Sequence, residues 1–318
     1  MIKKKTVFEL KASYYCNIKC NFCIFSERKG QNQLLASEQI LKAVKKISKN
    51  YPKIDCFVVS GGEPTIRKDL WRVLNVVYEY LKPQKIVIHT NGLILPPEEE
   101  MKKMIRKKVV IFLSFHTLSL ETYFQFTNTK KLPLLIKNLD KFSKKGITVF
   151  SNTIIMKLNQ NEVEKIGDYL FRKGVKKMEF RFPFGTGNRR TIFPWIIPDD
   201  FLGITNQLLN LLKKYSNKVT FFIHPSVLCI LMQKIPRSEK ALLEPIIKVA
   251  KESVGREEFI SGDGVEYLFL DPQMRLAKEE FQQIAINGSD TIFNKIEGCK
   301  KCIFKSSCLG IPVEFLDN

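Results

Sequence analysis

The sequence contains no run of the roughly 20 apolar residues that a membrane-spanning helix requires. The first ten residues start basic, and the polar residues Lys11 and Ser13 follow before an apolar stretch of signal-peptide length can form. These two absences predict a protein that neither spans a membrane nor carries a secretion signal, and they favour a cytoplasmic location.

Histidine is scarce, with three in 318 residues, and eight cysteines are too few for a disulfide scaffold in a chain of this length. The cysteines form two tight groups and two single residues, a pattern typical of metal ligation in a reducing compartment. One group is Cys16, Cys20 and Cys23, the other is Cys299, Cys302 and Cys308, and the single residues are Cys56 and Cys229.

Acidic residues are also under-represented, with 32 Asp and Glu against 52 Lys and Arg, which gives a formal net charge of +20. A basic surface suits nucleic acid, because bound phosphates need neutralisation. The lysines are nevertheless spread over predicted helix faces, and no basic run is interleaved with the aromatic residues that single-strand binders use. The pattern disfavours nucleic acid and favours an acidic protein partner.

The first 190 residues alternate short apolar runs with longer amphipathic ones, which predicts successive βα units and a parallel sheet. Six right-handed repeats of this kind curl into a partial (β/α)6 TIM-like barrel. We expect strands at 6–10, 54–59, 86–89, 109–115, 148–155 and 178–182, and helices at 38–49, 67–81, 98–107 and 162–173.

Beyond residue 182 the periodicity changes, and a turn-rich stretch suggests a boundary near residue 190. A helix at 199–215, a strand at 218–224 and a hairpin at 259–270 across Gly262-Asp263-Gly264 are expected after it. The predicted α/β fold therefore consists of the partial barrel at 1–190 and a small α+β module at 191–318.

The first cysteine group is the most informative motif in the chain. Its C-x3-C-x2-C spacing supplies three thiolates, one fewer than a sealed iron–sulfur cube takes, and so leaves one iron open to another ligand. A zinc knuckle is the less favoured alternative, because zinc sites usually add a second cysteine pair or histidines, and no histidine lies near this loop.

Two further motifs follow in order: Gly61-Gly62-Glu63-Pro64 after the second expected strand, and Thr90-Asn91-Gly92 after the third. With the cysteine spacing, they resemble the signature of the radical S-adenosylmethionine (SAM) superfamily. The resemblance implies a [4Fe-4S] cluster whose fourth iron is chelated by SAM, and it implies Phe22 beside the adenine. The metal ligands so implied are Cys16, Cys20 and Cys23.

The same resemblance implies that Gly61, Gly62, Glu63 and Pro64 form the site of the SAM amine, since glycines allow close backbone approach and Glu63 adds a negative charge. A tight strand-to-helix turn beginning at Pro64 is the structural alternative. Further SAM contacts are expected from polar residues at the carboxyl ends of later strands, where they compete with an interpretation as caps or turn residues. These residues are Asn91, Ser114, Asn152 and Arg181, and His116 is either a site residue or a structural histidine.

The second cysteine group, Cys299-x2-Cys302-x5-Cys308, resembles the auxiliary-cluster segment of the SPASM and twitch radical SAM subfamilies. The full SPASM pattern has another cysteine where Pro312 stands, and Ala277 lies near the expected place of an upstream ligand. We therefore expect one auxiliary [4Fe-4S] cluster, with a structural zinc site as the alternative.

The fourth ligand of this auxiliary cluster is open on sequence grounds. Cys229 is the obvious candidate, because Cys56 lies on an expected strand as an ordinary core thiol. Alternatively the auxiliary cluster keeps an open iron for substrate, or Cys229 is a free thiol that returns a hydrogen atom to a substrate radical.

The resemblance implies an enzyme that cleaves SAM reductively to a 5'-deoxyadenosyl radical and abstracts a hydrogen atom from a peptide or protein substrate. An acidic electron donor such as a flavodoxin or ferredoxin is the expected partner. The alternatives are a radical enzyme acting on a sugar, another small molecule or RNA, and a non-enzymatic iron–sulfur electron carrier.

Overall fold

The computed structural model describes residues 5–23, 34–183, 198–223, 265–270, 276–278, 293–294, 300 and 311–312. Four cysteines and the first half of the expected hairpin, residues 259–264, lie outside the described residues. Those cysteines are Cys229, Cys299, Cys302 and Cys308. In the described ranges no helix combines the length and the apolar character needed to cross a bilayer.

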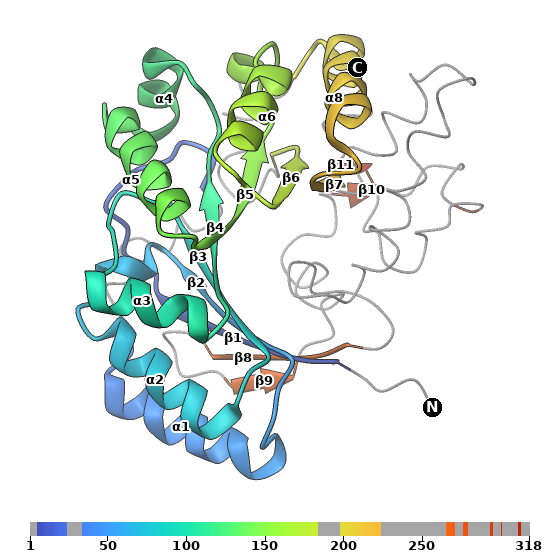
Figure 1. Cartoon of the computed structure of the whole chain (residues 1–318). Helices are drawn as coiled ribbons and strands as arrows, with labels where there is room; N and C mark the ends of the chain where they lie inside the picture. Colours follow the sequence, from blue (N-terminus) through green and yellow to red (C-terminus); the bar gives the residue numbers. More distant parts are fainter. Residues whose placement is uncertain are drawn as a thin grey trace.

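A nine-stranded sheet forms the centre of the described structure, in the order β7-β6-β5-β4-β3-β2-β1-β8-β9 (Figure 1). Neighbouring strands from β7 to β8 are parallel, and β9 pairs antiparallel with β8 at the edge. This sheet confirms the predicted α/β class. The strands are β1 (Lys5–Ser13), β2 (Cys56–Gly61), β3 (Lys85–Thr90), β4 (Val109–Ser114), β5 (Thr148–Ile154), β6 (Lys177–Arg181), β7 (Thr220–Ile223), β8 (Val265–Leu270) and β9 (Leu276–Lys278), and β10 (Phe293–Asn294) pairs separately with β11 (Ile311–Pro312).

Helices connect the strands and line the outer side of the sheet (Figure 1). Their buried faces meet strand residues such as Phe8, Phe57 and Ile86 in one large apolar core. The opposite face of β1 to β4 carries a smaller apolar cluster that includes Val7 and the fully buried Cys56, which confirms Cys56 as a core thiol. The helices are α1 (Ser37–Asn50), α2 (Leu70–Leu81), α3 (Glu98–Arg106), α4 (Leu120–Thr127), α5 (Leu132–Lys144), α6 (Val163–Arg172) and α8 (Phe201–Tyr215), with the short 3-10 turns η2 (Pro64–Ile66) and η3 (Lys157–Asn159).

Three helices differ from the sequence-based expectation. The pattern did not predict α4 and α5, because α4 is only two turns long and rich in threonine and aromatic residues, which are weak helix formers. The second helix begins at Leu70 and not at residue 67. Arg67 lies in the turn before it, where its buried guanidinium donates to the carbonyl of Leu35 at 2.7 Å and pairs with Asp69.

Strands from beyond residue 190 complete the sheet on both sides. The expected strand at 218–224 is observed as β7 next to β6, and β8 pairs in parallel register with β1. The sheet therefore extends past the six strands predicted for the barrel, and the domain boundary near 190 stays a prediction.

Candidate functional site

The cysteine loop, residues 14–23, leaves the carboxyl end of β1, and the thiols of Cys16, Cys20 and Cys23 are half-buried there. No three His, Cys, Asp or Glu side chains of the described ranges converge on one metal ion. A [4Fe-4S] cube does not require such convergence, because each thiolate binds a different iron. Three half-buried thiols on one loop are a donor set that suits this cluster.

Gly61 and Gly62 pack against the backbone at the start of this loop. A Cβ atom on Gly62 would lie 1.9 Å from the carbonyl oxygen of Tyr15, and one on Gly61 would lie 2.2 Å from that of Ser13. Gly61 also has a φ of +116°, which side chains disfavour. The backbone that leads from β1 into the loop lies directly against the end of β2, where Gly62 N–H donates to the carbonyl of Ser13 at 2.6 Å and Glu63 N–H donates to the carbonyl of Tyr15 at 2.9 Å. The glycines therefore serve first to seat the cysteine loop, a role that sequence reasoning missed.

Glu63 is 2% exposed, and its carboxylate is used within the protein. One oxygen accepts from the backbone and hydroxyl of Thr65 and from the Thr90 hydroxyl, and the other accepts from Asn91 N–H at 2.7 Å. Burial raises the pKa of Glu63 in spite of these hydrogen bonds. Pro64 begins the short 3-10 turn η2, as the structural alternative predicted. Glu63 in addition ties the end of β2 to the end of β3, and a contact with the SAM amine stays a prediction.

Asn91 links β3 to the cysteine loop. Its side-chain amide donates to Asn17 Oδ1 at 2.6 Å and reaches Cys16 Sγ at 3.8 Å, while its Oδ1 accepts from Leu93 N–H. The structure therefore brings the motifs after β1, β2 and β3 together at one end of the sheet, as predicted. It places Asn91 against a cysteine, and its expected contact with SAM stays untested.

Phe22 and His116 form the wall of the site on the β4 and β5 side. Phe22 is 8% exposed and contacts His116 edge to face at 5.1 Å between ring centroids. His116 Nδ1 accepts from the backbone N–H of Ile154 at 3.2 Å. Burial, assisted by the nearby charge of Arg181, lowers the pKa of His116 to about 3, so this imidazole is neutral and built into the wall.

This depressed pKa predicts an acid-sensitive step in the stability of the metal-free protein. Below pH 6.5 the unfolded state binds a proton at His116 that the folded state does not take up above about pH 3, so stability falls as pH is lowered through this window. We expect His116→Gln to reduce the stability lost between pH 7 and pH 5 by about 2 kcal/mol. Urea unfolding of both proteins at the two pH values measures this, and equal pH dependence would contradict it.

Ser114, Asn152 and Glu179 lie in register across β4, β5 and β6 and so share one face of the sheet. Arg181 follows on the same face and forms an ion pair with the fully buried Glu179. Apart from this pair, neither oxygen of Glu179 accepts a hydrogen bond from the part of the chain that the structure describes, and Asn152 Oδ1 has no hydrogen-bond partner there either. Sequence reasoning missed Glu179, although a glutamate inside an apolar strand was the available signal.

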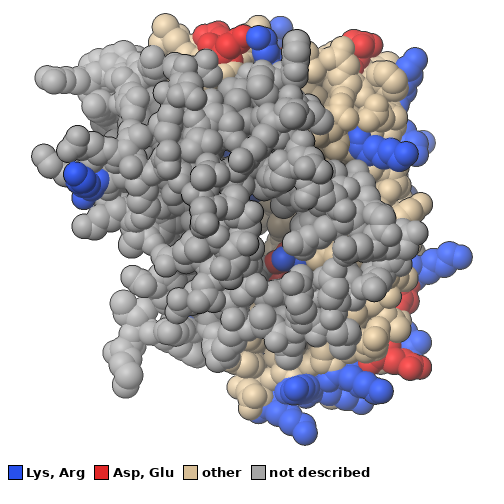
Figure 2. Space-filling model, turned by 180° about the vertical axis from the view of Figure 1, so that it is seen from behind, with Lys and Arg blue, Asp and Glu red and all other residues tan. Residues whose placement is uncertain are grey.

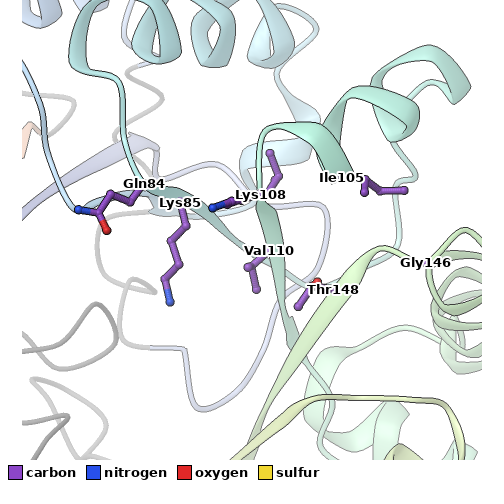
Figure 3. A pocket seen from close by; sticks show the side chains of 8 residues that line it. Gln84, Lys85, Ile105, Lys108, Val110, Gly146 and Thr148 are labelled. Atoms are coloured by element: carbon purple, nitrogen blue, oxygen red, sulfur yellow. The ribbon is translucent and has the colours of Figure 1, made fainter.

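A cavity of about 360 Å³ lies at the opposite end of the sheet (Figure 3). Its lining includes Lys85, Val109 and Thr148, which are the first residues of β3, β4 and β5. The motifs described above follow the last residues of their strands, so this cavity is separate from the candidate site.

Known proteins resemble the part of the chain that carries these motifs, both in sequence and in fold. A model of the family described as the radical SAM superfamily matches residues 10–170. A probable GTP 3',8-cyclase of Saccharolobus islandicus (strain Y.N.15.51 / Yellowstone #2) is 29% identical over 178 residues, 55% of this chain and 56% of that protein. The GTP 3',8-cyclase of Aliarcobacter butzleri is 26% identical over 187 residues, 56% of each chain. The chain thus spans about half the length of the curated relatives it matches.

Solved structures resemble almost the whole chain at low identity. Streptococcus suis SuiB bound to S-adenosylmethionine has a TM-score of 0.65 at 14% identity, over 99% of this chain and 75% of SuiB. The enzyme anSMEcpe with bound AdoMet has a TM-score of 0.65 at 16% identity, over 96% of this chain and 88% of that protein. At these identities the likeness establishes the fold.

Proposed function

Because the chain belongs to the radical SAM superfamily, we propose that it cleaves SAM reductively and uses the resulting radical on a peptide or protein substrate in the cytoplasm. The observation that carries this proposal is a loop with three half-buried thiols, whose first residues pack against Gly61 and Gly62 and whose Cys16 lies beside Asn91. The thiols of Cys16, Cys20 and Cys23 would hold the [4Fe-4S] cluster. When bound, the reduced cluster and SAM supply a 5'-deoxyadenosyl radical that removes a hydrogen atom from a C–H bond.

The residues of the chain itself position the reactants and exclude water. Phe22 of the cysteine loop and the neutral His116 form an uncharged wall of two rings, which suits an adenine. Ser114, Asn152 and Arg181 offer polar groups on the adjoining face for the ribose and carboxylate of SAM. Glu63 holds Asn91 in place by accepting a hydrogen bond from its backbone N–H.

Two substrate classes have specific support. SuiB has been solved with its precursor peptide SuiA and anSMEcpe with peptides, and these likenesses, at 14% and 17% identity, favour a peptide. The curated relatives named as GTP 3',8-cyclases favour a small molecule, of which GTP is the natural first test.

One experiment tests the reaction and separates these classes. The anaerobically reconstituted protein is reduced with dithionite, incubated with SAM, and analysed for 5'-deoxyadenosine. Product formation supports the enzyme, and its absence with an intact cluster supports the electron-carrier alternative. Stimulation by GTP would favour the small-molecule class, whereas stimulation by peptides encoded beside the gene would favour peptide maturation.

We also propose an acidic electron donor, such as a flavodoxin or ferredoxin, that docks near the cysteine loop. Lys19 lies exposed within the loop, and Lys130 and Lys131 are exposed next to it. Lys130 Nζ lies 5.7 Å from the ring centroid of Phe124, which is 38% exposed. Lysines around an exposed aromatic side chain are complementary to an acidic protein surface.

Charge reversal of Lys130 and Lys131 to Glu is therefore expected to lower the second-order rate of cluster reduction by an acidic flavodoxin by about tenfold at low salt. Stopped-flow absorbance measures this rate, with reduction by dithionite as an internal control. The double variant Lys46→Glu, Lys49→Glu is the matched control, because it makes the same change in net charge on α1, away from the cysteine loop. An equal slowing in both double variants would contradict a specific docking site.

The proposed RNA alternative has less support. Among the described residues on the face in Figure 2, basic side chains form several separate groups beside acidic and uncharged residues. A nucleic-acid site typically gathers its basic residues in one patch or stripe. Filter binding to bulk tRNA over a range of salt concentrations tests this alternative.

We further propose one auxiliary [4Fe-4S] cluster on Cys299, Cys302 and Cys308. Cys302→Ala is expected to reduce the iron content of the reconstituted protein to about half, because one of two equal clusters is lost. Zinc in the wild-type protein would instead support the structural zinc alternative.

Replacement of Cys229 with alanine tests the role of this residue. Loss of iron would identify Cys229 as a ligand of the auxiliary cluster, and intact iron with stalled turnover would identify it as a hydrogen donor.

A further inference from the structure

The carbonyl end of α4 contacts the cysteine loop directly. The last four carbonyl groups of an α-helix have no partner within the helix. In α4, the carbonyl of Thr127 accepts from Lys19 N–H at 3.2 Å, and that of Phe126 accepts from Asn21 N–H at 3.0 Å. The loop backbone on both sides of Cys20 is therefore bound to the end of this helix.

Two asparagine side chains add to these backbone contacts. Asn21 Nδ2 donates to the carbonyl of Gln125 at 2.6 Å. Asn128 Nδ2 donates to the carbonyl of Lys19 at 3.0 Å and to Asn21 Oδ1 at 3.3 Å. Asn128 ends the helix in the left-handed conformation, with a φ of 55°. Asparagine tolerates that conformation better than most residues, and here it also reaches the loop.

An aromatic contact with the same helix also holds the loop. Phe22 contacts Phe126 edge to face at 5.7 Å between ring centroids, and both side chains are buried. None of the hydrogen bonds or ring contacts named here uses a cysteine thiol.

From this geometry we infer that α4 holds the cysteine loop in its ligating conformation before any cluster is present, with Asn128 as the positioning residue. The inference rests on the proposed function only in that the loop is the cluster site. Because the loop is already ordered, cluster binding does not have to offset the conformational entropy of fixing it.

Hydrogen exchange in the metal-free full-length protein tests this inference without any catalytic activity. We expect the amides of Lys19 and Asn21 to exchange slowly in the wild type and about tenfold faster in Asn128→Gly, which removes the side chain but keeps the left-handed turn. Asn210→Ala, which removes an exposed asparagine bonded to Glu164, is the matched control and should leave both amides unchanged.

Two results would overturn the inference. One is exchange of both amides at the unprotected rate in the metal-free wild type. The other is acceleration in Asn128→Ala but not in Asn128→Gly, since this would assign the effect to strain at the helix end. A second readout is the loss of iron from reconstituted protein to a chelator, which we expect to be faster in Asn128→Gly. A chain that holds the loop but forms no 5'-deoxyadenosine would refute the proposed function and leave this inference standing.

Discussion

Replacing Cys20 with alanine is expected to remove the cluster at the cysteine loop and to reduce 5'-deoxyadenosine formation to background. Cys20 lies in the middle of the three-thiol set, and the loop on both sides of it is bound to α4, so no other cysteine of the loop can move into its place. Iron content, the electron paramagnetic resonance signal of the reduced protein and chromatography of the reaction products measure the effect.

Cys56→Ala provides the matched control for this prediction. Cys56 is fully buried in β2, away from the loop, and deletion of its sulfur costs packing energy on the order of 1 kcal/mol. This variant should be slightly less stable and retain the cluster signal. A Cys20→Ala protein that kept both its full iron content and its SAM cleavage would refute the assignment of the cysteine loop as the SAM-cluster site.

Gly62→Ala is expected to destabilise the protein by about 3 kcal/mol or more and to disturb the cysteine loop. The new Cβ would lie 1.9 Å from the Tyr15 oxygen, 2.5 Å from the Tyr15 carbonyl carbon and 2.8 Å from that of Tyr14. All three are backbone atoms, so the stem of the loop itself must move. The hydrogen bond from Glu63 N–H to Tyr15 would be lost in the process.

Alanine substitutions at two other glycines serve as controls, because they add a methyl group without a clash with backbone atoms. Gly146 has a φ of +70° with open space around its Cβ position, so Gly146→Ala should cost about 1–2 kcal/mol through backbone strain alone. In Gly167→Ala the Cβ would meet the side-chain end of Leu211 at 2.5 Å, which can rotate away. Chemical denaturation measures the free energy of unfolding of all three variants. A loss of stability in Gly62→Ala no greater than in Gly146→Ala would contradict the role of Gly62 in supporting the cysteine loop.

Local patterns in the sequence were enough to predict most strands and the site motifs. The alternation of apolar and amphipathic runs predicted β1 to β6 within a few residues, because a parallel strand buried on both faces is a short apolar run. The rule that functional residues follow the carboxyl ends of such strands predicted that the cysteine loop, Glu63 and Asn91 would lie together.

The sequence did not reveal how these motifs are supported. It gave no signal for the short helix α4, whose carbonyl end and Asn128 hold the cysteine loop across more than 100 residues of chain. It also suggested an incomplete reason for Gly61 and Gly62, because the clash with Ser13 and Tyr15 exists only once β1 and β2 are paired.

By itself, then, the amino-acid sequence determined where β1 to β6 lie along the chain, the thiol set and the chemistry that such thiols support, since all of these depend on neighbouring residues. Only the tertiary structure decided what holds the loop, where the carboxylates of Glu63 and Glu179 are directed, and that His116 is neutral. These properties arise from burial and from contacts between residues far apart in the chain, which no local pattern encodes.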